Sequence, residues 1–129
     1  MLHCQRLTVN YASATKPALC EIDFEIGPGE VVGVLGESGC GKSTLALSIL
    51  GLLPATARVE GSIRFQDQDL LHLSESQLRT IRGAQISMIH QEPGLSLSPV
   101  MRVGEQISEV LRAHRAMKNS RREHECKVM

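Results

Sequence analysis

The sequence has few aromatic side chains and no net charge, and each shortage excludes a class of protein. Its 129 residues include one tyrosine, two phenylalanines and no tryptophan. So few rings leave little surface on which the bases of a single strand could stack. Lysine plus arginine and aspartate plus glutamate number 14 each, so no overall field attracts nucleic acid. We therefore expect no nucleic-acid partner.

Long apolar runs and paired cysteine motifs are also missing. The longest apolar stretch, residues 45–53, is interrupted by Ser48 and Gly51 and is shorter than the roughly 18 residues of a membrane span. No basic segment followed by an apolar run opens the chain, so we expect no signal peptide. The cysteines form no C-x-x-C motif, which favours reduced thiols in a cytosolic compartment. The sequence predicts a soluble protein.

Several segments have the patterns of β-strands. Residues 6–10 and 21–26 alternate apolar with polar side chains, which predicts two strands with one buried face each. Residues 31–35 (VVGVL) are continuously apolar, as in a central parallel strand that is covered on both faces. Residues 62–66 and 85–89 predict two further strands.

Helical patterns alternate with these strands. Apolar residues recur at helical spacing through residues 45–53, and Pro54 predicts the end of that helix. Ser74 and Gln77 form a capping box, which predicts a helix start. Residues 103–114 place their apolar side chains on one helical face. The alternation predicts an α/β protein with an antiparallel contribution from the N-terminal strands.

A glycine-rich loop follows the apolar segment 31–35 and matches the pattern G-x-x-x-x-G-K-[ST]. Its glycines allow a tight turn that brings several N–H groups together, and the helix that begins at its end adds a positive dipole. Lys42 can reach the β- and γ-phosphates, and the Ser43 hydroxyl can bind the magnesium ion. We read Cys40 as a small filler without a redox role. The sequence thus predicts a nucleoside triphosphate site at Gly36, Glu37, Ser38, Gly39, Cys40, Gly41, Lys42, Ser43 and Thr44.

The loop alone does not choose among ATPases, GTPases and nucleotide kinases, but its surroundings do. The chain resembles the ATP-binding subunit of ABC transporters, in the oligopeptide, dipeptide and nickel importer branch. The resemblance spans nearly the whole chain and is most specific over its last segment. It is carried by residues 7–11 (LTVNY), 36–44 (GESGCGKST), 49–54 (ILGLLP), 71–83 (LHLSESQLRTIRG) and 86–114 (ISMIHQEPGLSLSPVMRVGEQISEVLRAH).

The resemblance implies a fold and its subdivision. It implies a P-loop NTPase core with a partial RecA-like parallel sheet, an N-terminal antiparallel β subdomain and the start of a helical subdomain. On this basis residues 1–30 form the antiparallel part. Residues 31–96 form the P-loop core with the Q-loop, and residues 97–129 form the start of the helical subdomain.

The resemblance also implies roles for two residues outside the glycine-rich loop. Tyr11 matches the A-loop aromatic that stacks on adenine, and Gln91 matches the Q-loop glutamine that reaches the magnesium ion and the attacking water. ATP and Mg²⁺ are the implied ligands, with Lys42 and Gln91 catalytic and Ser43 and Gln91 on the metal. From the residues alone, Tyr11 also fits a core or rim position, and Gln91 also fits a turn cap.

The implied partners and location follow from the same family. They are a second ABC ATPase subunit, identical or different, transmembrane permease subunits and a separate solute-binding protein. The subunit would lie at the cytoplasmic face of the inner membrane as a peripheral protein. The sequence does not indicate whether the solute is a peptide, nickel or another compound.

Later motifs of the family do not occur in these 129 residues. The L-S-G-G-Q signature, the Walker B strand, the D-loop and the switch histidine are absent. We therefore expect an N-terminal fragment of marginal stability that binds Mg·ATP weakly and has negligible turnover. Two alternatives stay open, a nucleotide-binding fragment without hydrolysis and a soluble ABC ATPase without a transporter.

Overall fold

The computed structural model describes residues 1–92, 94 and 97–114. The chain divides into two compact units, Met1–Leu78 and Arg79–Met129. The predicted division at 1–30, 31–96 and 97–129 stays a prediction, and part of its last segment lies outside the described residues. The elements are β1 (Leu2–Asn10), β2 (Leu19–Ile26), α1 (Lys42–Ile49), β3 (Arg58–Phe65), β4 (Gln68–Asp69), the 3-10 helix η1 (Leu70–His72), α2 (Glu75–Ile81) and α3 (Val103–His114).

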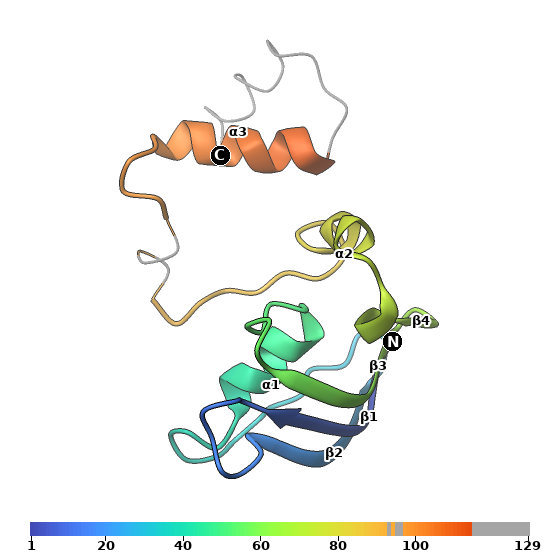
Figure 1. Ribbon diagram of the computed structural model, residues 1–129. Coiled ribbons are helices and arrows are strands. Elements are labelled where there is room, and N and C mark those ends of the chain that lie inside the picture. Colours follow the sequence, from blue (N-terminus) through green and yellow to red (C-terminus); the bar gives the residue numbers. More distant parts are fainter. Residues whose placement is uncertain (93, 95–96, 115–129) are drawn as a thin grey trace. The chain divides into compact units, whose positions relative to one another are not determined.

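An antiparallel sheet of four strands dominates the first unit (Figure 1). Its strand order is β2-β1-β3-β4, and every pair of neighbours is antiparallel. In the central strand β1, Cys4 pairs with Phe24 of β2 on one side and with Ile63 of β3 on the other. The predicted strands at the N-terminus and near residue 62 are confirmed, and each begins earlier than its sequence pattern indicates.

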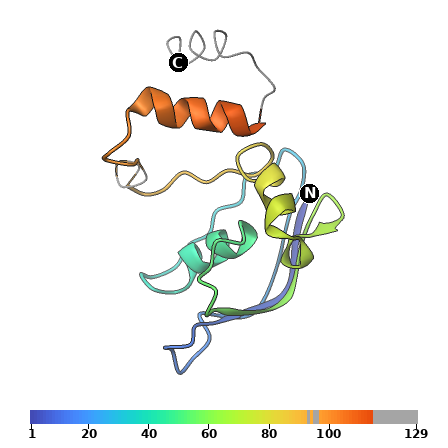
Figure 2. The same ribbon diagram turned by 45° about the horizontal axis from the view of Figure 1, so that its top comes forward.

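The core of this unit lies between the sheet and the elements that cover one of its faces. Leu7, Val9 and Ile63 are completely buried, and Leu50 at the end of α1 is buried with them. Figures 1 and 2 both show α1 beside the sheet. Cys4 belongs to the same core, and its burial raises the pKa of its thiol to about 12. The Cys4 thiol is therefore a neutral core group.

An irregularity crosses three neighbouring strands at one level. The register of β1 shifts on both sides near Arg6, where the backbone φ is 45°. Glu21 on β2 has a φ of 48° and Gly61 on β3 has a φ of 97°. A Cβ atom at Gly61 would lie 2.5 Å from the carbonyl oxygens of Gln5 and Arg6. Bulges of this kind increase local twist and bend the strand, so Gly61 is required where β3 crosses the bulge.

Helix α1 begins directly after the glycine-rich loop, as predicted, but it ends earlier than Pro54 suggests. Gly51 adopts a φ of 61°, and the N–H of Leu52 donates to the carbonyl of Leu47 at 2.9 Å. This is the hydrogen-bond pattern of a glycine-terminated helix. Gly51 therefore ends α1 at Ile49, and the predicted extent to residue 53 is wrong.

The two later helices follow their sequence signals. The N–H of Ser74 donates to Oε1 of Gln77 at 2.9 Å, and the N–H of Gln77 donates to Oγ of Ser74 at 3.4 Å. These reciprocal bonds confirm the predicted capping box at the start of α2. Helix α3 spans Val103–His114, the bounds that the apolar periodicity predicts.

Two of the predicted strands, the parallel strand at residues 31–35 and the further strand at 85–89, are wrong. Residues 31–35 and 85–89 form no strand in the described part of the chain. Residue Ile86 makes an isolated parallel bridge to Arg82. Val31 is 96% exposed, Leu35 95% and Ile89 90%. A strand requires a neighbour that completes its hydrogen bonds and covers its side chains. The apolar sequence provides the side chains for a strand, but the described residues provide no neighbour.

Candidate nucleotide site

The glycine-rich loop leads into a helix whose N-terminus has no side-chain cap. Gly39 and Gly41 have φ values of 81° and 100°, and Gly41 is the N-cap residue of α1. Because the N-cap residue is a glycine, it makes no side-chain cap hydrogen bond to the first turn. The opening N–H groups of a helix have no partner within the helix, and the dipole adds partial positive charge there. This end of α1 is therefore suited to a bound anion.

Two glycines of the loop lie in close contacts, and at Gly41 the contact is with backbone. A Cβ atom at Gly36 would lie 2.6 Å from Sγ of Cys40. A Cβ atom at Gly41 would lie 2.6 Å from the carbonyl oxygen of Ala18 and 2.7 Å from Cδ2 of Leu19. The loop thus lies directly on the start of β2. Sequence reasoning missed this contact, because no pattern in the sequence pairs position 41 with position 18.

The side chain of Lys42 folds back over the loop. Its Nζ atom donates to the carbonyl oxygens of Gly36 and Glu37, each at 2.7 Å, and lies 3.4 Å from Sγ of Cys40. An ammonium group has three donors, and the two short bonds use two of them. The third faces only a weak sulfur acceptor, so a phosphate oxygen can replace the thiol. The sequence predicted the lysine charge but not the contact with Cys40.

Tyr11 meets the first turn of α1 at the end of β1. Its hydroxyl lies 3.2 Å from Oγ1 of Thr44, and the pair is partly buried. Thr44 is tied further into the helix, because Oγ of Ser48 donates to its carbonyl oxygen at 2.6 Å. Ser43 is exposed on the same turn. The first unit thus brings together Tyr11 and the loop, although they are far apart in the sequence.

Gln91 is described only within the second unit. It is exposed and lies in a bend. Its predicted catalytic and metal-binding roles stay predictions, as does the contribution of the individual loop residues to nucleotide binding.

Comparison with known proteins connects this geometry to a family. Residues 19–128 match the ABC transporter family. The oligopeptide transport ATP-binding protein OppD of Salmonella typhimurium is 43% identical over 119 residues, which cover 91% of this chain and 36% of OppD. The dipeptide transport ATP-binding protein DppD of Bacillus subtilis is 43% identical over 121 residues, again 91% of this chain and 36% of the relative. The chain spans about a third of the length of these relatives.

Solved structures agree with the sequence comparison. The ATP-binding cassette MJ0796, in a dimeric post-hydrolysis state bound to ADP and Pi, superposes with a TM-score of 0.81 at 26% identity. That match covers 99% of this chain and 55% of the cassette, and it confirms the predicted fold class. Over the described residues, no helix has the length and apolar character required to cross a bilayer. The chain belongs to the ABC transporter family.

Proposed function

We propose that this chain is the nucleotide-binding part of an ATP-binding subunit in an ABC importer of peptides or nickel. The observation that carries the proposal is the uncapped N-terminus of α1 with Lys42 held over the loop that precedes it. The opening N–H groups of a helix beside a lysine ammonium suit a triphosphate tail better than any neutral ligand.

Each group at the site has a distinct part in holding Mg·ATP. The N–H groups of the loop and of the first turn of α1 face the phosphates, and the third donor of Lys42 binds a β- or γ-phosphate oxygen. The exposed Ser43 hydroxyl is a hard oxygen ligand of the kind that Mg²⁺ prefers. Tyr11, fixed through Thr44, offers an aromatic face to adenine.

The role of the longer protein extends this proposal. Relatives named for oligopeptide and dipeptide transport support a peptide importer, and the dimeric cassette supports pairing with a second ABC ATPase subunit. We infer coupling of ATP hydrolysis to import through transmembrane permease subunits, with a separate solute-binding protein that delivers the solute. The subunit would act at the cytoplasmic face of the membrane.

Calorimetric titration of the chain with Mg·ATP tests the nucleotide site. Lys42→Ala should weaken binding at least tenfold, because hydrogen bonds to charged groups contribute about 1.5–3 kcal/mol each. Arg64→Gln is the matched control, since it removes one positive charge from an exposed position on β3 and should leave the affinity unchanged. Steady-state turnover by the 129 residues should be negligible. Equal affinity of the wild-type chain and Lys42→Ala would refute the proposal.

A further inference from the structure

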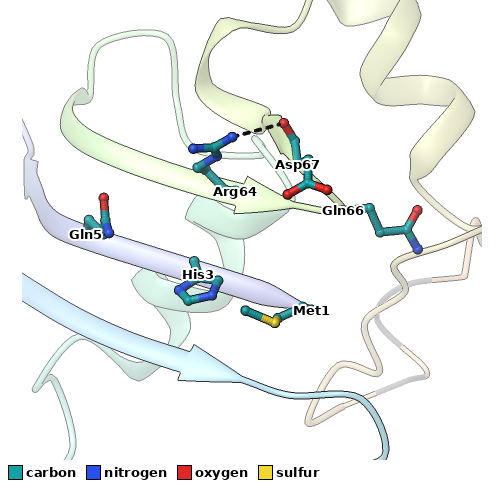
Figure 3. Close-up of a pocket in the computed structure, with 6 residues that line it drawn as sticks. All are labelled: Met1, His3, Gln5, Arg64, Gln66 and Asp67. Carbon is teal, nitrogen blue, oxygen red and sulfur yellow. Dashed lines mark hydrogen bonds between the residues drawn. The ribbon is translucent and has the colours of Figure 1, made fainter.

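A hollow lies on the sheet face that is turned away from the core, apart from the nucleotide site. Its volume is about 320 Å³, and it is lined by Met1, His3, Gln5, Arg64, Gln66 and Asp67 (Figure 3). His3 and Gln5 flank the buried Cys4 on β1, and Arg64 follows the buried Ile63 on β3. Successive side chains of a strand point to opposite faces, so these three share the outer face. None of the lining residues belongs to the nucleotide site.

Arg64 provides more hydrogen-bond donors than any other side chain of this hollow. In the described part of the chain, its guanidinium makes one hydrogen bond, from Nη2 to the carbonyl oxygen of Asp67 at 3.4 Å. Arginine carries five N–H donors, so several remain for a ligand. The planar guanidinium fits a carboxylate through two parallel hydrogen bonds. Arg64 can therefore bind the carboxylate of a ligand at this position.

Three neighbouring side chains also line the hollow. His3 lies directly opposite Arg64 in the sheet, and its Nε2 atom is 3.5 Å from Oε1 of Glu25. When Nε2–H of a neutral imidazole donates to Glu25, Nδ1 of His3 is an acceptor and offers no donor to a carboxylate. The side-chain amides of Gln5 and Gln66 make no hydrogen bond to other described residues. Arg64, His3 and Gln5 thus line the hollow side by side, whereas the Gln66 carboxamide extends away from the Arg64 guanidinium (Figure 3).

The carboxylate of Asp67 at the rim of the hollow restricts which kinds of ligand can bind there. Gln66 and Asp67 form the tight turn between β3 and β4, with φ values of 48° and 69°. The Asp67 carboxylate lines the hollow that Arg64 also lines, as Figure 3 shows. This carboxylate repels a dianion such as phosphate and attracts an ammonium group. A ligand that carries both a carboxylate and an ammonium group can pair the first with Arg64 and the second with Asp67.

We propose that this hollow binds a small zwitterion, an α-amino acid or a dipeptide. Its carboxylate lies on Arg64, with the Gln5 amide beside it, and its ammonium group faces Asp67. The hollow opens to solvent, so the charged groups are screened and little apolar surface is buried. We therefore expect a dissociation constant on the order of millimolar.

Nuclear magnetic resonance titration of the 129-residue chain tests the proposal. The probes are alanyl-alanine, acetate, methylammonium and inorganic phosphate, and the signals are Nε–H of Arg64 and the side-chain amide of Gln5. Alanyl-alanine should shift these signals at millimolar concentration. Acetate, methylammonium and phosphate should each bind at least about tenfold more weakly, because each lacks one of the two charge-assisted contacts.

Two variants and a control complete the test. Arg64→Gln should weaken alanyl-alanine binding at least about tenfold. Arg58→Gln removes the same charge from an exposed position on the same strand, outside the hollow, and should not change it. Asp67→Asn should abolish the preference for alanyl-alanine over acetate. The absence of shifts at these signals, stronger binding of phosphate, or unchanged affinity in Arg64→Gln would overturn the proposal.

Discussion

The segment at residues 31–35 is more apolar than the alternating strands of the antiparallel sheet, yet only the sheet is paired and buried. In the sheet, β1 pairs on both sides, and Leu7, Val9 and Ile63 are completely buried. The segment 31–35 has no neighbour in the described part of the chain, and Val31 and Leu35 lie almost fully in solvent. The difference teaches that a strand depends on its neighbours as much as on its own residues.

The strongest way to break this comparison is to remove one apolar side chain from the sheet and one from residues 85–89, the other apolar segment that has no strand partner among the described residues. Ile63→Ala should destabilise the fold by about 2–5 kcal/mol, since it leaves a cavity in a closed core. Ile89→Ala is the matched control, because Ile89 is 90% exposed in a segment without a strand partner, and its effect should stay within about 0.5 kcal/mol. Urea denaturation measures both. Equal losses would mean that residues 85–89 pack as a strand in solution.

The next substitution tests the bulge in the sheet, and its expected loss of stability is smaller than the largest loss expected for Ile63→Ala. Gly61→Ala should cost more than about 2 kcal/mol, because the left-handed backbone alone costs about 1–2 kcal/mol and the new Cβ would lie 2.5 Å from two carbonyl oxygens. Gly29→Ala provides the control, with a φ of 72° and no atom within 4 Å of the new Cβ. Its cost should be about 1–2 kcal/mol. Thermal unfolding that ranks Gly29→Ala as the more damaging change would contradict the close approach of β3 to β1.

Elements set by local chemistry could be predicted from the sequence. The capping box of Ser74 and Gln77 starts α2, and apolar periodicity gives the bounds of α3. The glycine-rich loop and the start of α1 at Lys42 follow from a short motif. In each case the deciding interactions join residues that are only a few positions apart.

Features that depend on distant backbone could not be predicted in this way. The contact of Gly41 with Ala18 and the approach of Gly61 to Arg6 join segments that have no sequence pattern in common. The strands expected at residues 31–35 and 85–89 fail for the same reason, since their neighbours cannot be inferred from their own composition. The position of Tyr11 beside Thr44 was implied by family resemblance and not by periodicity.

The central claim is that the uncapped N-terminus of α1, with Lys42 over the loop, holds a triphosphate. The most direct measurement is the change in backbone amide chemical shifts when Mg·ATP is added to the isotope-labelled chain. We predict the largest changes at residues 36–44, with a smaller change at Tyr11 and none at Arg64. Changes that concentrate elsewhere, or shifts at residues 36–44 that persist unchanged in Lys42→Ala, would contradict the claim.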